Sequence, residues 1–267
     1  MLTRILSSVI LFPIALIIIN MGGTALRAVL LLISVIGMGE LYKALNGRLS
    51  FENLLSALAL LAYYLLLDVM SKQILMIVIG LYIVSNLLCL VMLNSKVPPI
   101  NFMVNIFGFF YVGFLLSGIY LTRAHIHGQY LVWLIFISAW ACDTFAYFTG
   151  RFFGKHKLAP VLSPKKTVEG AIGGTLGAAL VAAVFAYVIL NFTAVGYESN
   201  FIVICALIGG VGAVFGQIGD LTASAIKRHN GIKDYGKLIP GHGGILDRFD
   251  SVICTAPMVY VIVQLLM

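Results

Sequence analysis

The sequence predicts an all-α integral membrane protein that crosses the bilayer with about nine helices. Hydrophobic residues make up 61% of the 267 residues and charged residues only 10%, whereas a soluble domain carries about 25% charge. The apolar runs are continuous and about 17–25 residues long, as in helices that span a bilayer, and they lack the alternation of membrane-barrel strands. Because unpaired backbone groups are too costly in lipid, helices are the expected form of these runs.

In chain order, the predicted spans are residues 4–20, 24–45, 51–69, 73–93, 101–121, 130–149, 168–190, 201–226 and 248–266. The first has the single arginine and apolar core of a signal peptide, but Pro13 interrupts it and an Ala-x-Ala-like cleavage site is missing, so we expect a retained helix. Residues 1–128 have short loops and scattered charges. Residues 129–267 carry two long polar loops and acids within apolar runs, and are the expected catalytic region of one continuous membrane domain.

The four cysteines all lie in apolar runs and none forms a Cys-x-x-Cys pair; they are Cys89, Cys142, Cys205 and Cys254. Small, unpaired cysteines in apolar surroundings are typical of packing residues. We therefore expect neither a disulfide framework nor a zinc site.

Lysine and arginine predict the orientation of the spans. With a cytoplasmic N-terminus, 17 basic residues divide unequally, and three fall on the far side: Arg27, Lys72 and Arg123. The others fall on the cytoplasmic side, which places both long polar loops there. The net charge of +7 then faces anionic headgroups and soluble anions, although for scattered charges ordinary topology is a sufficient explanation.

Asp143 and Asp220 both lie inside predicted spans. Asp143 precedes Arg151 by eight residues, which is roughly 12 Å along a helix, and Asp220 precedes Lys227 by seven. A carboxylate at bilayer depth costs about 2.5–3.5 kcal/mol, so it needs a cation, a metal ion or a wet cavity. The simpler alternative is a structural ion pair, for example between Asp143 and a lysine of a neighbouring helix.

Residues 224–250 hold the densest group of charges. The charged residues are Lys227, Arg228, Lys233, Asp234, Lys237, Asp247, Arg248 and Asp250. If the last helix begins near Gly244, Asp247 and Asp250 share one face of its first turn, where helix capping is the alternative role. Carboxylates of Asp220 and Asp247 on two helix ends that face one loop are suited to Mg²⁺. His229 and His242 lack the ligand spacing of a transition-metal site.

A glycine-rich turn lies within this segment. Gly241, Gly243 and Gly244 allow the backbone to approach an anion and to point N–H groups at it, and a helix N-terminus follows. The turn is not a nucleotide-binding loop of the GxxxxGK[ST] type. An ordinary turn is the alternative, but the surrounding lysines, arginines and acids favour a site for phosphate and a metal ion.

The other polar loop, residues 150–170, contains Ser163-Pro164-Lys165-Lys166-Thr167 directly before a glycine-rich segment. Ser163 or Thr167 is suited to cap the following helix, with Glu169 placed to assist. Lysines are disfavoured at a helix start because they oppose the helix dipole. A bound polyanion would remove this conflict.

Together these residues resemble a known signature. The pattern Ser224-x-x-Lys227-Arg228-x4-Lys233-Asp234, followed by Pro240-Gly241-His242-Gly243-Gly244-x-x-Asp247-Arg248-x-Asp250, is similar to that of the phosphatidate cytidylyltransferases (CDP-diacylglycerol synthases). The segment 163–170 and the helix of Asp143 also look like this family. The resemblance is specific across residues 140–251 and only topological in the N-terminal half. It implies the reaction CTP + phosphatidate → CDP-diacylglycerol + pyrophosphate at the cytoplasmic face of the cell's inner membrane.

The resemblance also implies roles for individual residues. Asp220 and Asp247 would hold Mg²⁺, with Asp250 and Asp143 as further ligands or as groups that orient lysines, and a second cation such as K⁺ is allowed. Catalysis would fall to Asp220, Asp247, Lys227 and Asp250. CTP and the lipid phosphate would be bound by Ser163, Lys165, Lys166, Thr167, Arg228, Lys233, Asp234, His242, Gly243, Gly244, Arg248 and Asp143. The family suggests a homodimer, and no nucleic acid takes part.

Two other functions stay open at this point. One is a different membrane transferase, such as a CTP-dependent lipid kinase or an enzyme that acts on an ether lipid. The other is an ion-coupled transporter with the acids as ion sites. Transporters place such sites near the bilayer midplane between repeated halves, whereas the acids and glycines here gather near one face.

Overall fold

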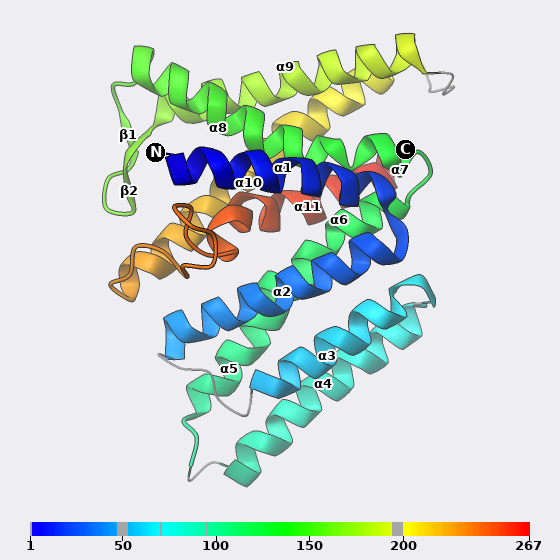
Figure 1. Cartoon of the computed structure of the whole chain (residues 1–267), viewed down its shortest axis with the longest axis vertical. Coiled ribbons are helices and arrows are strands. Elements are labelled where there is room, and N and C mark those ends of the chain that lie inside the picture. The colour runs from blue at the N-terminus through cyan, green and yellow to red at the C-terminus, as the bar shows by residue number, and fades with distance from the viewer. Residues whose placement is uncertain (1, 47–52, 70, 94–95, 194–199) are drawn as a thin grey trace. The chain divides into compact units, whose positions relative to one another are not determined.

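The computed structural model describes residues 2–46, 53–69, 71–93, 96–193 and 200–267, and it is almost entirely helical (Figure 1). The elements are α1 (Leu2–Met21), α2 (Gly23–Asn46), α3 (Asn53–Leu66), η1 (Leu67–Val69), α4 (Lys72–Leu93), α5 (Pro99–Gly108), η2 (Phe109–Phe114), α6 (Leu115–Ala124), α7 (Gly128–Leu131), α8 (Trp133–Phe153), β1 (Lys157–Ala159), β2 (Ser163–Thr167), α9 (Val168–Phe192), α10 (Phe201–His229) and α11 (Leu246–Leu266). The predicted all-α fold is confirmed.

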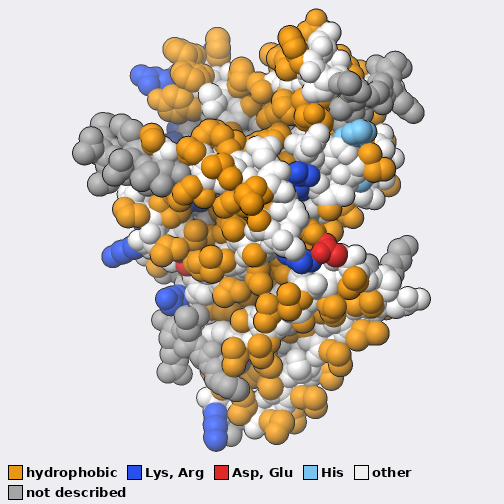
Figure 2. Space-filling view, turned by 45° about the vertical axis from the view of Figure 1, so that its right-hand side comes forward, with side chains coloured by type: hydrophobic (Ala, Val, Ile, Leu, Met, Phe, Trp, Pro, Cys, Tyr) orange, Lys and Arg blue, Asp and Glu red, His pale blue; other side chains and the backbone are white. Residues whose placement is uncertain are grey.

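Within the described ranges, seven helices are long and apolar enough to cross a membrane: Gly23–Asn46, Gln73–Leu93, Pro99–Ala124, Gly128–Phe153, Val168–Phe192, Phe201–His229 and Leu246–Leu266. Two of the nine predicted spans correspond to shorter apolar helices, Leu11–Met21 and Asn53–Val69, and their crossing stays a prediction. Arg48 and the first two residues of the predicted span 51–69 lie outside the described residues. Figure 2 shows hydrophobic side chains over much of the visible face, as expected for a surface in lipid.

The chain forms two compact units whose sequences are interleaved. Unit 1 comprises residues 1–117 and 230–248, and unit 2 comprises residues 118–229 and 249–267. The segment 230–248 therefore belongs to unit 1. The helix before it, α10, belongs to unit 2, and so does α11 from residue 249 onward. The sequence predicted a different division, with residues 129–267 as the catalytic region of one membrane domain, and this stays a prediction.

Buried hydrogen bonds between side chains hold the helices of unit 1 together. Tyr63 and Ser117 pair through their hydroxyl oxygens at 2.8 Å, and Asn53 donates to Oδ1 of Asn105 at 2.6 Å. Tyr82 also donates to the backbone carbonyl of Asn105, at 2.9 Å. Such bonds satisfy polar groups that lipid cannot solvate.

The predicted span 101–121 is one apolar stretch but not one regular α-helix. Its middle turn, η2, is a π-helix between α5 and α6. A π-turn widens the backbone and often marks a position under functional or packing constraint. Here the carbonyl of Gly113, within η2, accepts a hydrogen bond from the hydroxyl of Tyr64 at 3.2 Å.

Small residues allow the helices of unit 2 to approach closely. Figure 1 shows α8 and α9 side by side, and a Cβ on Gly174 of α9 would lie 2.8 Å from the carbonyl oxygen of Cys142 on α8. A Cβ on Gly209 of α10 would lie 2.7 Å from the carbonyl oxygen of Ala178 on α9. Close backbone contact of this kind is how helices pack in membranes, where the hydrophobic effect does not drive them together.

Candidate active site

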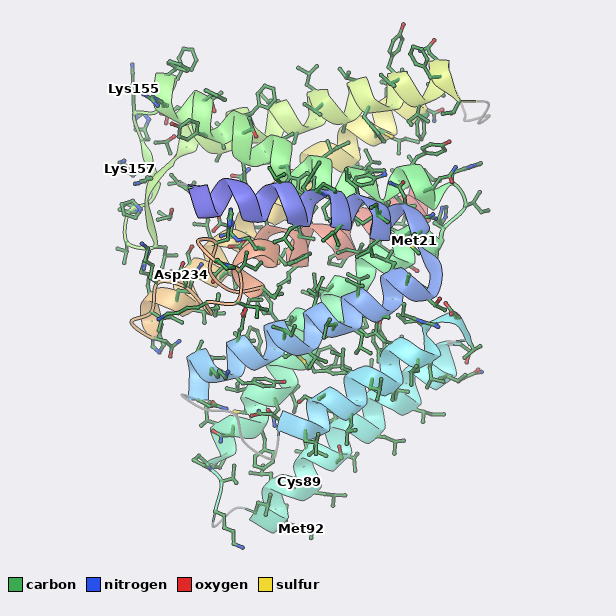
Figure 3. All side chains as sticks on the ribbon, viewed as in Figure 1. Met21, Cys89, Met92, Lys155, Lys157 and Asp234 are labelled. Carbon is green, nitrogen blue, oxygen red and sulfur yellow. The ribbon has the colours of Figure 1, made fainter. Side chains whose placement is uncertain are left out.

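The polar segment between α8 and α9 folds into a short antiparallel hairpin. Strand β1 pairs with β2 in the register Lys157 with Thr167 and Ala159 with Ser163, where the sequence had indicated only a loop. The ammonium of Lys157 donates to the carbonyl of Pro164 at 2.8 Å. Figure 3 shows Lys155 and Lys157 on the chain that leaves α8 toward this hairpin.

Thr167 caps α9, which decides between the two predicted cap residues. Its hydroxyl accepts a hydrogen bond from the backbone N–H of Gly170 at 3.1 Å, whereas Ser163 lies in β2. Glu169 extends back to the start of the hairpin. Its carboxylate accepts from the N–H of Lys155 at 3.1 Å and from the N–H of His156 at 3.2 Å, and it pairs with the His156 ring nitrogen Nδ1 at 2.6 Å. The cap and this carboxylate fix the hairpin to the helix start.

Replacing Glu169 with Ala should release the base of the hairpin, because three hydrogen bonds to residues 155 and 156 are lost. We expect trypsin to cleave after Lys155 and Lys157 in the folded protein several-fold faster than in the unchanged chain, since local opening governs cleavage of exposed segments. Mass spectrometry of the fragments measures the rate at each site. Equal rates in both proteins would show that Glu169 does not hold the hairpin.

A cavity of about 320 Å³ lies within unit 2, beside the hairpin. It is lined by residues of α8, the hairpin, the start of α9 and one turn of α10: Cys142, Asp143, Ala146, Tyr147, Gly150, Arg151, Leu158, Lys165, Lys166, Thr167, Gly170, Ala171 and Gln217. Four predicted site residues, Asp143, Lys165, Lys166 and Thr167, thus line one space. A concave site with a few converging charged groups is typical of a ligand pocket.

An ion pair connects the hairpin with α10 at this cavity. The ammonium of Lys166 binds Oδ2 of Asp220, and the two side chains are 28% and 27% exposed. Asp143 on α8 is close enough to interact electrostatically with both. The alternative of a structural ion pair therefore applies to Asp220 rather than to Asp143, and the lysine comes from a strand rather than from a helix. Asp143, Asp220 and Lys166 thus lie near one another, and Lys165 also lines the cavity. Such a group of charges can bind a phosphate and a cation together.

Asp250 lies where α11 packs against α10 within unit 2. Its backbone carbonyl occupies the space that a Cβ on Gly219 would need, so the residue before Asp220 contacts Asp250 directly. The carboxylate of Asp250 accepts from the N–H of Ser251 at 2.8 Å. At the end of α10, Lys227 is half-buried and Arg228 is exposed, and cations in a last turn also favour the helix dipole.

In unit 1, Asp247 organises the glycine-rich segment. Its side chain is only 5% exposed, and Oδ2 accepts from the N–H of Tyr235 at 2.8 Å and from the N–H of Gly244 at 3.0 Å. Both N–H groups precede α11, so Asp247 ties the helix start to the segment before it, and its predicted capping role stays a prediction. A Cβ on Gly243 would lie 2.8 Å from the same oxygen, which explains why this position has no side chain.

The predicted turn is also present. Gly241 and Gly243 have φ angles of +78° and +89°, which glycine adopts without strain, and the N–H of Ile239 donates to the carbonyl of Gly243 at 2.9 Å. His242 is half-buried. Three further predicted residues are exposed: Lys233, Asp234 and Arg248. Figure 3 shows Asp234 on the segment between α10 and α11.

The donor atoms suit a hard cation better than a soft one. Among the described residues, no group of three or more His, Cys, Asp and Glu side chains gathers at one point. Asp143 lines the cavity, and Asp220 binds the cavity-lining Lys166. Mg²⁺ typically takes one or two carboxylates and fills its other positions with water and substrate phosphates. Asp220 and Asp247 belong to different units, so the predicted metal ion shared by these two stays a prediction.

The structure adds three residues that the sequence interpretation had not named as site residues. Gln217 and Arg151 line the cavity, and Gln217 donates to the carbonyl of Ala171 at 3.2 Å and to the hydroxyl of Thr175 at 3.1 Å. Glu40 of α2 binds the start of α11. The sequence could have indicated Glu40, because it is an acid inside the apolar span 24–45. Asp143 and Asp220 were selected for the same reason.

Comparison with known proteins gives matches along almost the whole chain. Residues 2–266 match the model of the cytidylyltransferase family. A phosphatidate cytidylyltransferase of Staphylococcus haemolyticus is 35% identical over 266 residues, which cover 98% of this chain and 96% of the relative. One from Staphylococcus epidermidis is 36% identical over 265 residues with the same coverage. One from Staphylococcus aureus is 40% identical over 154 residues, which are 57% of this chain and 55% of the relative.

Proposed function

Because the chain belongs to the cytidylyltransferase family, we propose that it transfers CMP from CTP to phosphatidate and releases CDP-diacylglycerol and pyrophosphate. The match to relatives named phosphatidate cytidylyltransferase over 98% of the chain is the observation that carries the proposal. The Asp143–Lys166–Asp220 cluster supports it, because Asp143 and Lys166 line a cavity together with the cations Lys165 and Arg151.

In this reaction a phosphatidate oxygen attacks the α-phosphorus of CTP. A P–O bond forms there, the bond between the α-phosphorus and the bridging oxygen breaks, and pyrophosphate leaves with the electron pair. Two anions must meet, so the protein's task is to position them and to offset their repulsion. Lys165 and Lys166 line the cavity and are placed to bind phosphate oxygens. Asp220 holds the ammonium of Lys166 in place.

A divalent cation would neutralise charge on the phosphates when bound. Asp143 and Asp220 are the candidate ligands in unit 2, and Asp247 is the candidate in unit 1. We keep Asp250 as a further candidate ligand of the cation. The candidate phosphate-binding groups remain Lys227, Arg228 and Lys233. A second cation such as K⁺ and a homodimer are part of the proposal.

The proposed location is the cytoplasmic face of the inner membrane. The chain is a multi-pass membrane protein, and its basic residues predict that both long polar segments face the cytoplasm. Phosphatidate is itself a membrane lipid, so it can reach the site while its acyl chains remain in the bilayer. CTP is soluble and reaches the site from the cytoplasm.

The direct test uses the purified full chain in lipid nanodiscs with CTP labelled at the α-phosphate, phosphatidate and Mg²⁺. We expect a labelled CDP-lipid and one pyrophosphate for each lipid made. Parallel reactions contain diacylglycerol in place of phosphatidate, and CDP release in them would identify a lipid kinase instead. Absence of both products, in protein that remains folded by its thermal transition, would contradict the proposal.

A further inference from the structure

Glu40 is a buried carboxylate that binds the backbone of a distant part of unit 1. It lies on α2 and is 8% exposed. One oxygen, Oε1, accepts from the N–H of Ile245 at 3.0 Å, and the other, Oε2, accepts from the N–H of Leu246 at 2.8 Å. The side chain therefore binds the first turn of α11, more than 200 positions away in the sequence.

The backbone around Glu40 is shaped to fit it. A Cβ on Gly236 or on Gly244 would collide with the Glu40 carboxylate. Gly236 lies in the interior of the segment that leads into α11 and Gly244 near its end, so two separate parts of that segment contact the side chain. Neither glycine has a positive φ angle. The space for Glu40, rather than the backbone conformation, therefore explains why these positions lack side chains.

The N–H groups at the start of α11 are the groups that compensate the Glu40 charge. In the part of the chain that the structure describes, no Lys or Arg forms an ion pair with it. The two N–H groups and the positive end of the α11 dipole favour an anion at this place. The residue that follows Leu246 is Asp247, whose own carboxylate accepts from the N–H of Gly244. The backbone of residues 244–246 is thus held from two sides, by Glu40 and by Asp247.

We propose that Glu40 is a positioning residue for the reaction: it fixes the first turn of α11 and thereby orients Asp247 and the glycine-rich turn 241–244. The N-terminal half then takes part in forming the catalytic site and is more than a membrane anchor. The effect on turnover rests on the proposed function, whereas the effect on the segment 230–248 does not.

The variant Glu40→Gln tests the proposal with little change in shape. Its amide keeps one acceptor oxygen, but its NH2 group faces an N–H donor, so one of the two bonds is lost. We expect kcat to fall about 10–100-fold, as for other groups that orient a ligand residue. The Mg²⁺ concentration for half-maximal rate should rise, while KM for phosphatidate should stay within about twofold, because Glu40 acts on Asp247 and not on the lipid.

A second measurement needs no activity. Lys237, in the segment 230–248, and Lys157, in the hairpin of unit 2, are both exposed. Glu40→Gln should speed trypsin cleavage after Lys237 about tenfold or more and leave cleavage after Lys157 unchanged, because only the segment 230–248 loses a restraint. General unfolding would speed both. The matched control is Asp68→Asn, which removes another acid of unit 1, the partner of Arg27, and should change neither cleavage nor turnover.

Gly236→Ala provides a variant that keeps the Glu40 charge. The added methyl displaces the carboxylate, so the same pattern should appear: slower turnover, and faster cleavage after Lys237 only. Wild-type turnover in folded Glu40→Gln protein, or lost turnover with unchanged cleavage after Lys237, would overturn the proposal. If the unchanged protein makes no CDP-lipid, the proposed function fails instead, and the cleavage rates still decide whether Glu40 holds the segment.

Discussion

Asp220→Asn should lower turnover of CTP and phosphatidate by about 10²–10³-fold, the scale at which loss of one electrostatic group affects a transition state. The amide keeps the shape of the side chain but removes the charge that pairs with Lys166 and interacts with Asp143. The measurement is the rate of labelled CDP-lipid formation at saturating substrates. Thr222→Val on the same helix is the matched control, since the Thr222 hydroxyl donates to the helix carbonyl of Ile218.

The double variant Asp220→Asn/Lys166→Met separates a catalytic role from a structural one. A lone Asp220→Asn change leaves Lys166 without its carboxylate, so the double change should recover thermal stability, since it removes both members of the pair. Turnover should stay low, because neither group is then available to the substrates. Recovery of turnover along with stability would show that the ion pair only supports the fold.

Asp247→Asn should also lower turnover about 10²–10³-fold, but with the glycine-rich segment still folded. The amide oxygen of Asn can accept from the N–H groups of Tyr235 and Gly244 as the carboxylate does. The negative charge that the proposed role would offer to a cation is lost. We therefore expect slow turnover, a higher Mg²⁺ requirement, and cleavage by trypsin after Lys237 close to that of the unchanged protein.

This result would differ from that of Glu40→Gln, in which both turnover and the segment are affected. The matched control is Leu238→Ala, on the same segment, whose side chain is 57% exposed. If Asp247→Asn kept its turnover while Leu238→Ala behaved normally, Asp247 would have no place among the catalytic groups.

The spans could be predicted from the sequence because hydropathy is a local property. A run such as 168–190 must be helical in lipid whatever it packs against, and the structure places α9 over nearly the same residues. The pairing of Lys157 with Thr167 depends on a turn and on Glu169, and no apolar pattern marks it. The π-turn at residues 109–114 is apolar like the α-helices on either side of it, so hydropathy does not mark it.

Part of the candidate site could likewise be predicted from the sequence, and part required the fold. Charge density and glycines pointed to Asp143, Lys166, Asp220 and Asp247, because acids and lysines are rare in this chain. The pairing of Lys166 with Asp220 spans 54 positions and required the fold. Glu40 had a local signal, but its partners are backbone N–H groups, and these leave no mark in the sequence. Hydrogen bonds between a side chain and distant backbone N–H groups are therefore the contacts that the sequence predicts least well here.

The bond between Glu40 and the start of α11 also has a consequence for biosynthesis. Glu40 precedes Ile245 by 205 positions, and a ribosome adds about 5–20 residues per second. Glu40 is therefore synthesised roughly 10–40 seconds before the N–H groups that bind its carboxylate exist. Until then the Glu40 carboxylate of the newborn chain needs other hydrogen-bond donors, such as water. Assembly of unit 1 is complete only when the last helix has begun to emerge.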